Sequence, residues 1–111
     1  MALIQVTMLA ANPEIQVLGG VVYITAVTWN ASGALASAGT STTIQITGPN
    51  AAIIQSFTAM TADSTGKFSY KFVTATSNLP GAYSVEIRAT DSAEVYSKLE
   101  PYLFTLYDPP R

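Results

Sequence analysis

The chain has 111 residues, of which only 11% are charged, with five Lys or Arg against seven Asp or Glu. Its basic residues are too few and too dispersed for nucleic-acid binding, which needs clustered Lys and Arg to neutralise phosphates. The absence of Cys and His excludes thiolate chemistry and removes the commonest general base and metal ligand. We expect one non-catalytic domain over 1–111 that uses no cofactor and no metal.

The segment 15–62 contains no charged residue, although Thr, Ser, Gln, Asn and Gly interrupt it throughout. These polar residues exclude a membrane span, which needs about 20 consecutive apolar residues, so we expect no membrane partner. A soluble surface normally carries dispersed charges of both signs. We therefore interpret the segment as surface that is covered in an assembly, with the chain present as a homo-oligomer or in multiple copies on other protein subunits.

The N-terminal segment 1–13 predicts a strand over 2–9, which we expect to be available to a neighbour's sheet. Its first residues, MALIQV, have neither the basic region nor the continuous apolar region of a signal peptide. We expect a chain that is made in a cytoplasm and is not exported by the usual route.

The strand predicted over 20–30 is apolar on both faces. One face holds Val22, Ile24 and Ala26, and the other holds Tyr23, Val27 and Trp29. Such a strand is either central and covered on both sides, or it faces a partner. The alternative is a bulge near Ala26, because a bulge would turn Val27 and Trp29 into the core.

The remaining predicted strands are short and are separated by turns rich in Gly, Asn, Asp and Pro. They lie over 14–18, 40–47, 52–60, 66–75, 81–90 and 94–107. Apolar residues occupy every second position, most regularly in 66–75 and 81–90, as in half-buried antiparallel strands. Pro101 should bend or interrupt the last strand. The pattern predicts an all-β, two-sheet antiparallel sandwich of about seven strands.

Three segments follow one another along the chain: GGVVYITA leading into NASG at 19–33, TADSTGKFSY at 61–70 and LPGAYSVEI at 79–87. In this order they resemble immunoglobulin-like β-sandwich modules of the bacterial and macroglobulin-like kind, over roughly residues 14 to 92. The resemblance implies that Gly66 and Gly81 supply positive φ at turns and that Phe68 and Tyr83 point between the sheets. It implies no particular function, because such sandwiches serve many roles.

Three acids fall in or beside predicted turns and form a candidate calcium site, namely Asp63, Asp91 and Glu94. The preferred interpretation is that Asp63 hydrogen-bonds its own D-x-x-G turn. The pattern Asn30-Ala31-Ser32 matches an N-glycosylation acceptor, but we interpret it as an ordinary turn.

Glu86 and Arg88 share one face of the strand predicted over 81–90. Glycosidase-type chemistry would need two converging acids in a cleft. We expect instead solvated cross-strand pairs, with Lys67 or Lys71 lying opposite.

The C-terminal tail 101–111 is rich in aromatic residues and ends in Pro-Pro-Arg. One interpretation is a final strand that completes the sheet. The other is that the tail extends onto a neighbouring subunit, since Tyr and Arg are favoured interface anchors. The interface candidates are Tyr23, Val27, Trp29, Tyr102, Phe104, Tyr107 and Arg111.

We interpret the chain as a non-catalytic structural module, most consistent with a bacteriophage virion accessory such as a capsid decoration, head-fibre or tail protein. Its expected partner is then a major capsid or tail protein. The alternative is a carbohydrate- or cell-surface-binding module of a secreted bacterial protein, located outside the cell, with Tyr23 and Trp29 as a stacking platform. In either case we expect the strands within 15–62 to form the covered side and those within 67–90 to face water.

Overall fold

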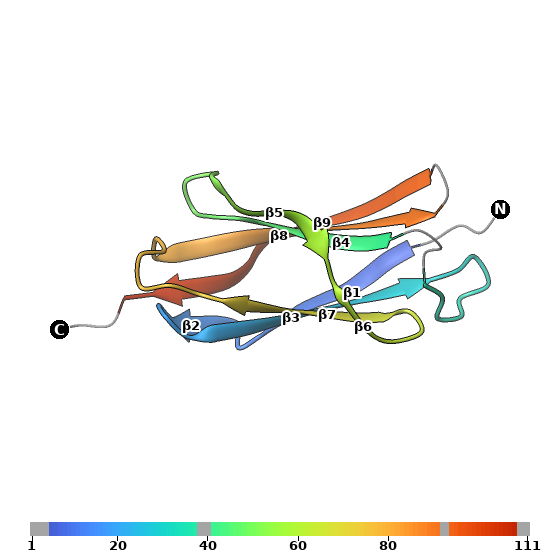
Figure 1. The fold of residues 1–111 in the computed structure, drawn as a ribbon, viewed down its shortest axis with the longest axis horizontal. Helices are drawn as coiled ribbons and strands as arrows, with labels where there is room; N and C mark the ends of the chain where they lie inside the picture. Colours follow the sequence, from blue (N-terminus) through green and yellow to red (C-terminus); the bar gives the residue numbers. More distant parts are fainter. Residues whose placement is uncertain (1–4, 38–40, 92–93, 109–111) are drawn as a thin grey trace.

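The computed structural model describes residues 5–37, 41–91 and 94–108, which form nine strands in two facing layers (Figure 1). The strands are β1 (Gln5–Asn12), β2 (Ile15–Val17), β3 (Val21–Trp29), β4 (Ser41–Thr47), β5 (Ile53–Ala59), β6 (Thr61–Ser64), β7 (Lys67–Val73), β8 (Gly81–Asp91) and β9 (Glu94–Tyr107). One sheet has the order β1-β3-β7-β6, and the other has the order β2-β9-β8-β4-β5. Within the described residues, no helix is long and apolar enough to cross a membrane.

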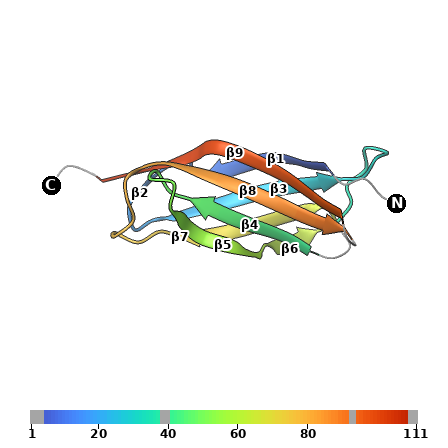
Figure 2. The ribbon, with the colours of Figure 1, turned by 90° about the horizontal axis from the view of Figure 1, so that it is seen from above.

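The two layers lie over one another along their whole length, with β9 above β1 at one side and β5 beside β6 at the other (Figure 2). All strand pairs are antiparallel except β2 with β9, which is parallel. The prediction of an all-β two-sheet protein is therefore confirmed, with nine strands in place of about seven.

Alternating burial places one face of each strand in the core. Along β8, Tyr83, Val85, Ile87 and Ala89 are fully buried, while the residues between them are not. Phe68 and Tyr83 both point between the sheets, as expected. The period-2 pattern of the sequence thus decided which side chains form the core.

Three aromatic rings fill the core near the C-terminal end of β9. Tyr83 and Phe104 stack with 5.2 Å between ring centroids and 8° between planes. Phe72 from the opposite sheet tilts against both, at 6.4 Å from Tyr83 and 5.9 Å from Phe104. The cluster joins the two layers, because each ring contributes a large buried area and its neighbours have favourable offset or tilted geometry.

The first two strands link both sheets. β1 pairs with β3 in one sheet, and after a cis Asn12–Pro13 bond the chain crosses to pair with β9 in the other. A hydrogen bond of 2.8 Å from the Thr105 N–H to the Glu14 carbonyl joins the crossing segment to β9.

The extra strands are short, and one of them was not predicted. β6 has four residues, and all four are exposed. A strand of this length with no buried side gives no apolar alternation, so the sequence pattern carries no signal for it.

Candidate protein-binding surface

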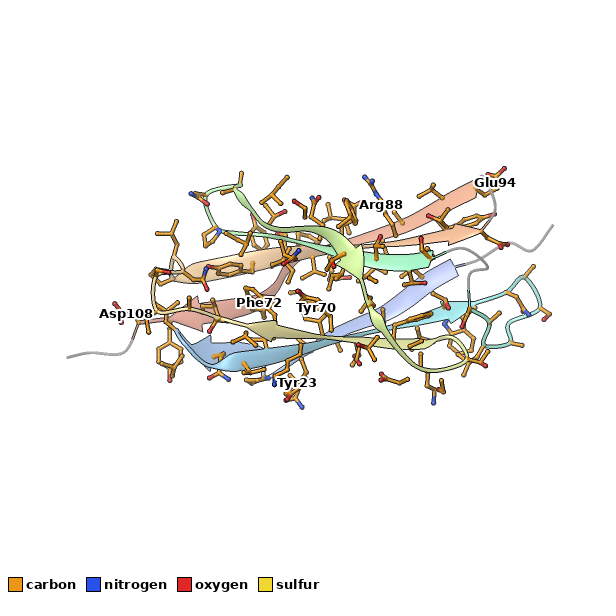
Figure 3. The ribbon with its side chains drawn as sticks, in the orientation of Figure 1. Tyr23, Tyr70, Phe72, Arg88, Glu94 and Asp108 are labelled. Atoms are coloured by element: carbon orange, nitrogen blue, oxygen red, sulfur yellow. The ribbon has the colours of Figure 1, made fainter. Side chains whose placement is uncertain are left out.

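The outer side of β3 and β7 forms a surface that we call the β3 face. It consists of Val21, Tyr23, Thr25, Val27 and Trp29 on β3 and Lys67, Ser69, Lys71 and Val73 on β7. These residues face outward because Val22, Ile24, Ala26 and Thr28, which alternate with the β3 residues, are buried. In Figure 3 the Tyr23 side chain points away from both layers, while those of Tyr70 and Phe72 lie between them.

The register of β3 decides between the two sequence interpretations of this strand. β3 pairs with β7 without interruption from Val21 opposite Val73 to Val27 opposite Lys67. The irregularity lies in β1, between Thr7 and Ala10. β3 is therefore a central strand, and Val27 and Trp29 are not turned into the core by a bulge near Ala26.

Exposure differs along the β3 face. Tyr23 is 49% exposed and Val73 is 62% exposed, whereas Val27 and Trp29 are half-buried. Lys71 lies opposite Tyr23, and Lys67 lies opposite Val27. The uncharged strand β3 and the charged strand β7 thus share one face. We expected the strands within 15–62 to form a covered side and those within 67–90 to form a separate side facing water, and this expectation is wrong. The reason is that neighbours in a sheet need not be neighbours in sequence.

The loop after Trp29 is held to the body by backbone bonds. The Ala36 N–H donates to the Thr28 carbonyl at 3.1 Å, and the Thr28 N–H donates to the Gly66 carbonyl at 2.8 Å. Asn30 forms a turn in which its side-chain oxygen accepts hydrogen bonds from the Ser32 and Ala34 backbone N–H groups. These hydrogen bonds stabilise a local turn, which accounts for the residue types at Asn30-Ala31-Ser32.

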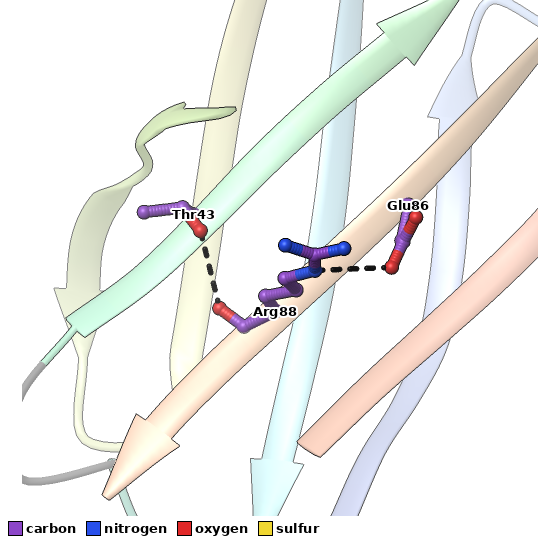
Figure 4. Close-up of polar contacts among 3 residues, drawn as sticks. All are labelled: Thr43, Glu86 and Arg88. Carbon is purple, nitrogen blue, oxygen red and sulfur yellow. Dashed lines mark hydrogen bonds and ion pairs between the residues drawn. The ribbon is translucent and has the colours of Figure 1, made fainter. Parts of the chain in front are cut away.

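The outer face of the second sheet carries an ion pair between Glu86 and Arg88 (Figure 4). The Arg88 Nε donates to Glu86 Oε2 at 3.2 Å, and the Arg88 guanidinium carbon lies 4.1 Å from the Phe57 ring centroid. The cross-strand neighbours of Arg88 are Thr43 and Ser97. The expected cross-strand pairs with Lys67 or Lys71 are therefore wrong, because both lysines belong to the other sheet, and Glu86 pairs instead with Arg88 two positions along its own strand.

The C-terminal interface candidates that the structure describes lie in two environments. Tyr102 is 76% exposed and Tyr107 is 42% exposed, so both rings are accessible. Phe104 is 1% exposed and stacks on Tyr83, so it is a core residue whose ring cannot reach a second protein. Arg111 lies outside the described residues.

Tyr102 has an unusual backbone. Its φ is +57°, in the left-handed region that a bulky residue rarely adopts. It sits where the β8–β9 register shifts, because Tyr83 pairs with Phe104 whereas Val85 pairs with Glu100. The Ser84 hydroxyl accepts the Tyr102 N–H at 3.3 Å. The bulge next to Pro101 confirms the predicted interruption and turns the Tyr102 ring outward.

The candidate calcium ligands do not form a site. Asp63 accepts a hydrogen bond from the Ser69 hydroxyl at 3.1 Å on the surface of its own sheet. Among the residues that the structure describes, no group of three acidic, His or Cys side chains is placed to hold a metal ion.

Sequence reasoning did not assign Val95 and Leu99, which are 56% and 58% exposed. They face outward because their partners on β8 are Thr90 and Glu86, and cross-strand partners share a face. The alternation of Glu94, Lys98 and Glu100 with these apolar residues predicts the opposite orientation, so the sequence pattern carries no signal that Val95 and Leu99 face outward.

A scan against known protein families and a search of curated proteins give no match to this sequence. Among solved structures, the fold is similar to part of the Pseudomonas fluorescens alkylpurine DNA glycosylase AlkC bound to DNA containing an abasic site analog. The TM-score is 0.55 and the sequence identity is 12%, over 96% of this chain and 31% of that one. The chain thus spans about a third of that protein, and the likeness concerns the fold alone.

Proposed function

We propose that this chain is a non-catalytic structural module that binds other protein subunits in a larger assembly. The observation that carries the proposal is the β3 face, where exposed Tyr23 and Val73 and half-buried Val27 and Trp29 lie on strands in the middle of a sheet. Central strands are rigid, and exposed apolar side chains on a rigid surface are typical of protein-binding sites.

The side chains of the β3 face also indicate which side chains a binding partner would present. Lys67 and Lys71 lie between the apolar residues of this face, and the acid beside them, Asp63 on β6, accepts a hydrogen bond from the Ser69 hydroxyl. A complementary surface would offer apolar groups beside carboxylates, because charge complementarity fixes the orientation of two partners.

We further propose that the sandwich is immunoglobulin-like. The strand orders β1-β3-β7-β6 and β9-β8-β4-β5 correspond to the two sheets of that fold in its version with an added edge strand. The Tyr83 hydroxyl donates to the Leu79 carbonyl at 2.6 Å, as in the tyrosine corner at the start of the sixth strand of such domains. This finer assignment supports a scaffold role, although it names no partner.

Within that class we place the chain in a bacteriophage virion, as a capsid decoration, head-fibre or tail protein. The resemblance to bacterial immunoglobulin-like modules, the absence of Cys and the low charge support this placement.

The exposed Tyr23 ring also favours a second candidate, a carbohydrate-binding module. Tyr23 and Trp29 are six positions apart on β3, which corresponds to roughly 20 Å along a strand. The two rings therefore cannot stack on the same sugar, and a glycan would have to extend along the strand to meet both. This spacing favours a protein partner.

The test is co-sedimentation of the purified chain with the capsid and tail proteins encoded in the same genome. We expect the Tyr23→Asp variant to lose binding at least about tenfold, because a carboxylate replaces an apolar contact beside the partner's acids. Ser77→Asp, a change of equal charge in the exposed loop after β7, should bind like the parent. Absence of binding by the parent chain would refute the assembly role, and binding of glycan arrays by the parent alone would favour the second candidate.

A further inference from the structure

Tyr102 combines an unfavourable backbone conformation with an exposed side chain. Its φ of +57° is adopted by Gly or Asn at far lower cost than by Tyr. The residue is 76% exposed, so packing within the domain does little to compensate for this conformation. Residues held in sparsely populated conformations cluster at functional contacts. The Tyr102 ring is therefore a candidate anchor for a second protein.

Tyr102 belongs to the outer side of the second sheet, on a surface that we call the β8–β9 face. Its N–H donates to the hydroxyl of Ser84, which alternates with fully buried residues of β8. Val95 and Leu99 are also more than half exposed on this face. The β8–β9 face consists of Ser84, Glu86, Arg88 and Thr90 on β8 and Val95, Ser97, Leu99 and Tyr102 on β9. It is a second surface with exposed apolar residues, and it lies on the other sheet from the β3 face.

The charged residues of the β8–β9 face are one acid and one base. Glu86 and Arg88 lie two positions apart on β8 and form an ion pair of 3.2 Å. The β3 face instead carries Lys67 and Lys71. Because a two-fold interface places the same patch on both sides, two β3 faces would bring lysines together. The β8–β9 face can meet its own copy, since its acid can lie opposite the base of the second chain.

We infer that the β8–β9 face binds the same face of a second copy of this chain. The two-fold axis lies between the two facing sheets, perpendicular to the strands, and passes over Ile87. The two β8 strands then run antiparallel, and Glu86 of each copy lies opposite Arg88 of the other. Each ion pair joins the second one in a network of four charges, so burial leaves none of them without a partner.

The same axis brings apolar residues together. It places Ser84 of one copy opposite Thr90 of the other, since both lie three positions from Ile87. Tyr102 lies beside Ser84, and Val95 pairs with Thr90. The exposed Tyr102 ring of each copy therefore packs on the exposed Val95 of the other. This contact buries the ring that the unfavourable backbone holds outward.

Other two-fold arrangements leave charges unmatched. An axis along β8 places Glu86 opposite Glu86 of the second copy and Arg88 opposite Arg88. A perpendicular axis moved to Glu86 or to Arg88 also brings like charges together, which is destabilising. An axis moved to Val85 places both charged residues opposite uncharged ones, so their charges lose solvent without gaining partners. Among these arrangements, the Ile87 axis is the one that satisfies the charges of both copies.

The first test separates the effect of Tyr102 on folding from its effect on association. Tyr102→Gly removes the ring and the unfavourable conformation together, because Gly adopts a positive φ without a steric clash. We expect the midpoint of thermal unfolding, measured where the parent is monomeric, to rise by a few degrees. Sedimentation equilibrium should nevertheless show dimerisation at least about tenfold weaker than that of the parent.

Tyr23→Gly is the matched control for Tyr102→Gly. It removes an exposed ring from the β3 face, where the backbone is that of an ordinary strand. We expect it to lower the unfolding midpoint and to leave dimerisation unchanged. A Tyr102→Gly chain that dimerises like the parent, or a Tyr23→Gly chain that dimerises equally weakly, would overturn the contact.

The second test exchanges charges between copies. Arg88→Glu gives the β8–β9 face two acids, and Glu86→Arg gives it two bases. Each variant alone should dimerise at least about tenfold more weakly than the parent, because like charges then lie opposite each other. An equimolar mixture of the two variants should dimerise at least as tightly as the parent, and a mixture that fails to recover would overturn the pairing of Glu86 with Arg88.

Lys98→Glu is the control for total charge in the second test. It changes the net charge as much as Arg88→Glu does and is exposed, but its β8 partner is the buried Ile87, so it lies on the other side of β9. We expect its dimerisation to match that of the parent. Thermal unfolding of each charge variant checks that the substitutions leave the fold intact.

The third test reads the orientation of the two copies. The chain has no Cys, so Ser84→Cys and Thr90→Cys each introduce a single thiol. Facing sheets lie about 10 Å apart, within reach of a short bismaleimide cross-linker. We expect cross-linked dimers when the two variants are mixed and few when either is alone. Cross-linking of Ser84→Cys with itself would overturn the Ile87 axis in favour of an axis along β8.

This inference goes beyond the proposed function, because it concerns a different face of the domain. A parent chain that stays monomeric up to about 1 mM would overturn the β8–β9 contact. A monomeric parent that still binds capsid or tail proteins refutes only this contact, whereas a dimer that binds none of them refutes only the assembly role.

Discussion

At the scale of single residues, Tyr83 connects the turn before β8 to the core. Its ring is fully buried against Phe72 and Phe104, and its hydroxyl donates to the Leu79 carbonyl at 2.6 Å. Burial raises the pKa of the Tyr83 hydroxyl above its ordinary value of 10.0, because the charged form loses its solvation. One side chain thus fixes the turn, fills the core and adds a pH dependence to the stability.

We expect Tyr83→Phe to lower the free energy of unfolding by about 1 kcal/mol at neutral pH, because the ring stays and one hydrogen bond is lost. The raised pKa favours the protonated hydroxyl in the folded state. Its contribution is therefore complete below about pH 10 and disappears as the pH rises through the folded pKa. Urea unfolding at pH 7 and above pH 10 should show the parent losing more stability than the Phe variant. Equal losses in the two proteins would contradict this assignment.

At the scale of elements, the turn between β6 and β7 controls how the loop after β3 packs. Gly66 has a φ of +72°, and its N–H donates to the Ser37 hydroxyl at 2.9 Å. A Cβ at this position would lie 2.7 Å from the Thr28 carbonyl oxygen and 2.9 Å from the Ala36 nitrogen. The turn therefore needs Gly both for its backbone conformation and for the close approach of two other segments.

We expect Gly66→Ala to lower the free energy of unfolding by about 2–4 kcal/mol, which combines the cost of the left-handed conformation with that of displacing backbone atoms. Gly33→Ala is the matched control. Gly33 has a φ of +83°, but apart from its chain neighbours no described residue lies within 4 Å of its Cβ position, so only the conformational cost of about 1 kcal/mol applies. Denaturant unfolding of both variants separates the two effects. Similar losses would show that the close approach to Thr28 and Ala36 contributes nothing.

At the scale of the whole molecule, low charge leaves surface that can associate. The net charge is −2, and the edge strand β5 carries no charge along Ile53–Ala59. Ile53 is 58% exposed on that edge. Exposed apolar edge strands are sites of unintended association, although the register shifts in β5 reduce this tendency.

We expect Ile53→Glu to slow aggregation of the concentrated protein several-fold at neutral pH without lowering its thermal stability. The reason is that a charge on an edge strand opposes pairing with other chains. Ser77→Glu changes the net charge equally but lies in a loop, so it separates the edge effect from the effect of total charge. Light scattering during incubation measures both, and equal protection by the two variants would refute a role for the β5 edge.

Much of this architecture could be predicted from the sequence. Alternating apolar residues and the turns between them predict eight of the nine strands, and the burial of Phe68 and Tyr83, which the sequence resemblance implies, agrees with this alternation. The pattern could not show that β3 and β7 lie side by side, since pairing between distant strands leaves no local trace. For the same reason Phe104 was interpreted as an interface residue, although its ring completes the core.

The parallel pairing of β2 with β9 has a mechanical consequence. Gln5 begins β1 and Asp108 follows β9 at opposite ends of the domain, and the segment from β1 to β2 runs in the same direction as β9. Tension applied at these two residues would pull β2 and β9 in opposite directions along their common axis. The bonds from the Thr105 N–H to the Glu14 carbonyl and from the Leu18 N–H to the Tyr107 carbonyl would then bear the load together. A domain loaded in this way resists extension collectively instead of opening one bond at a time.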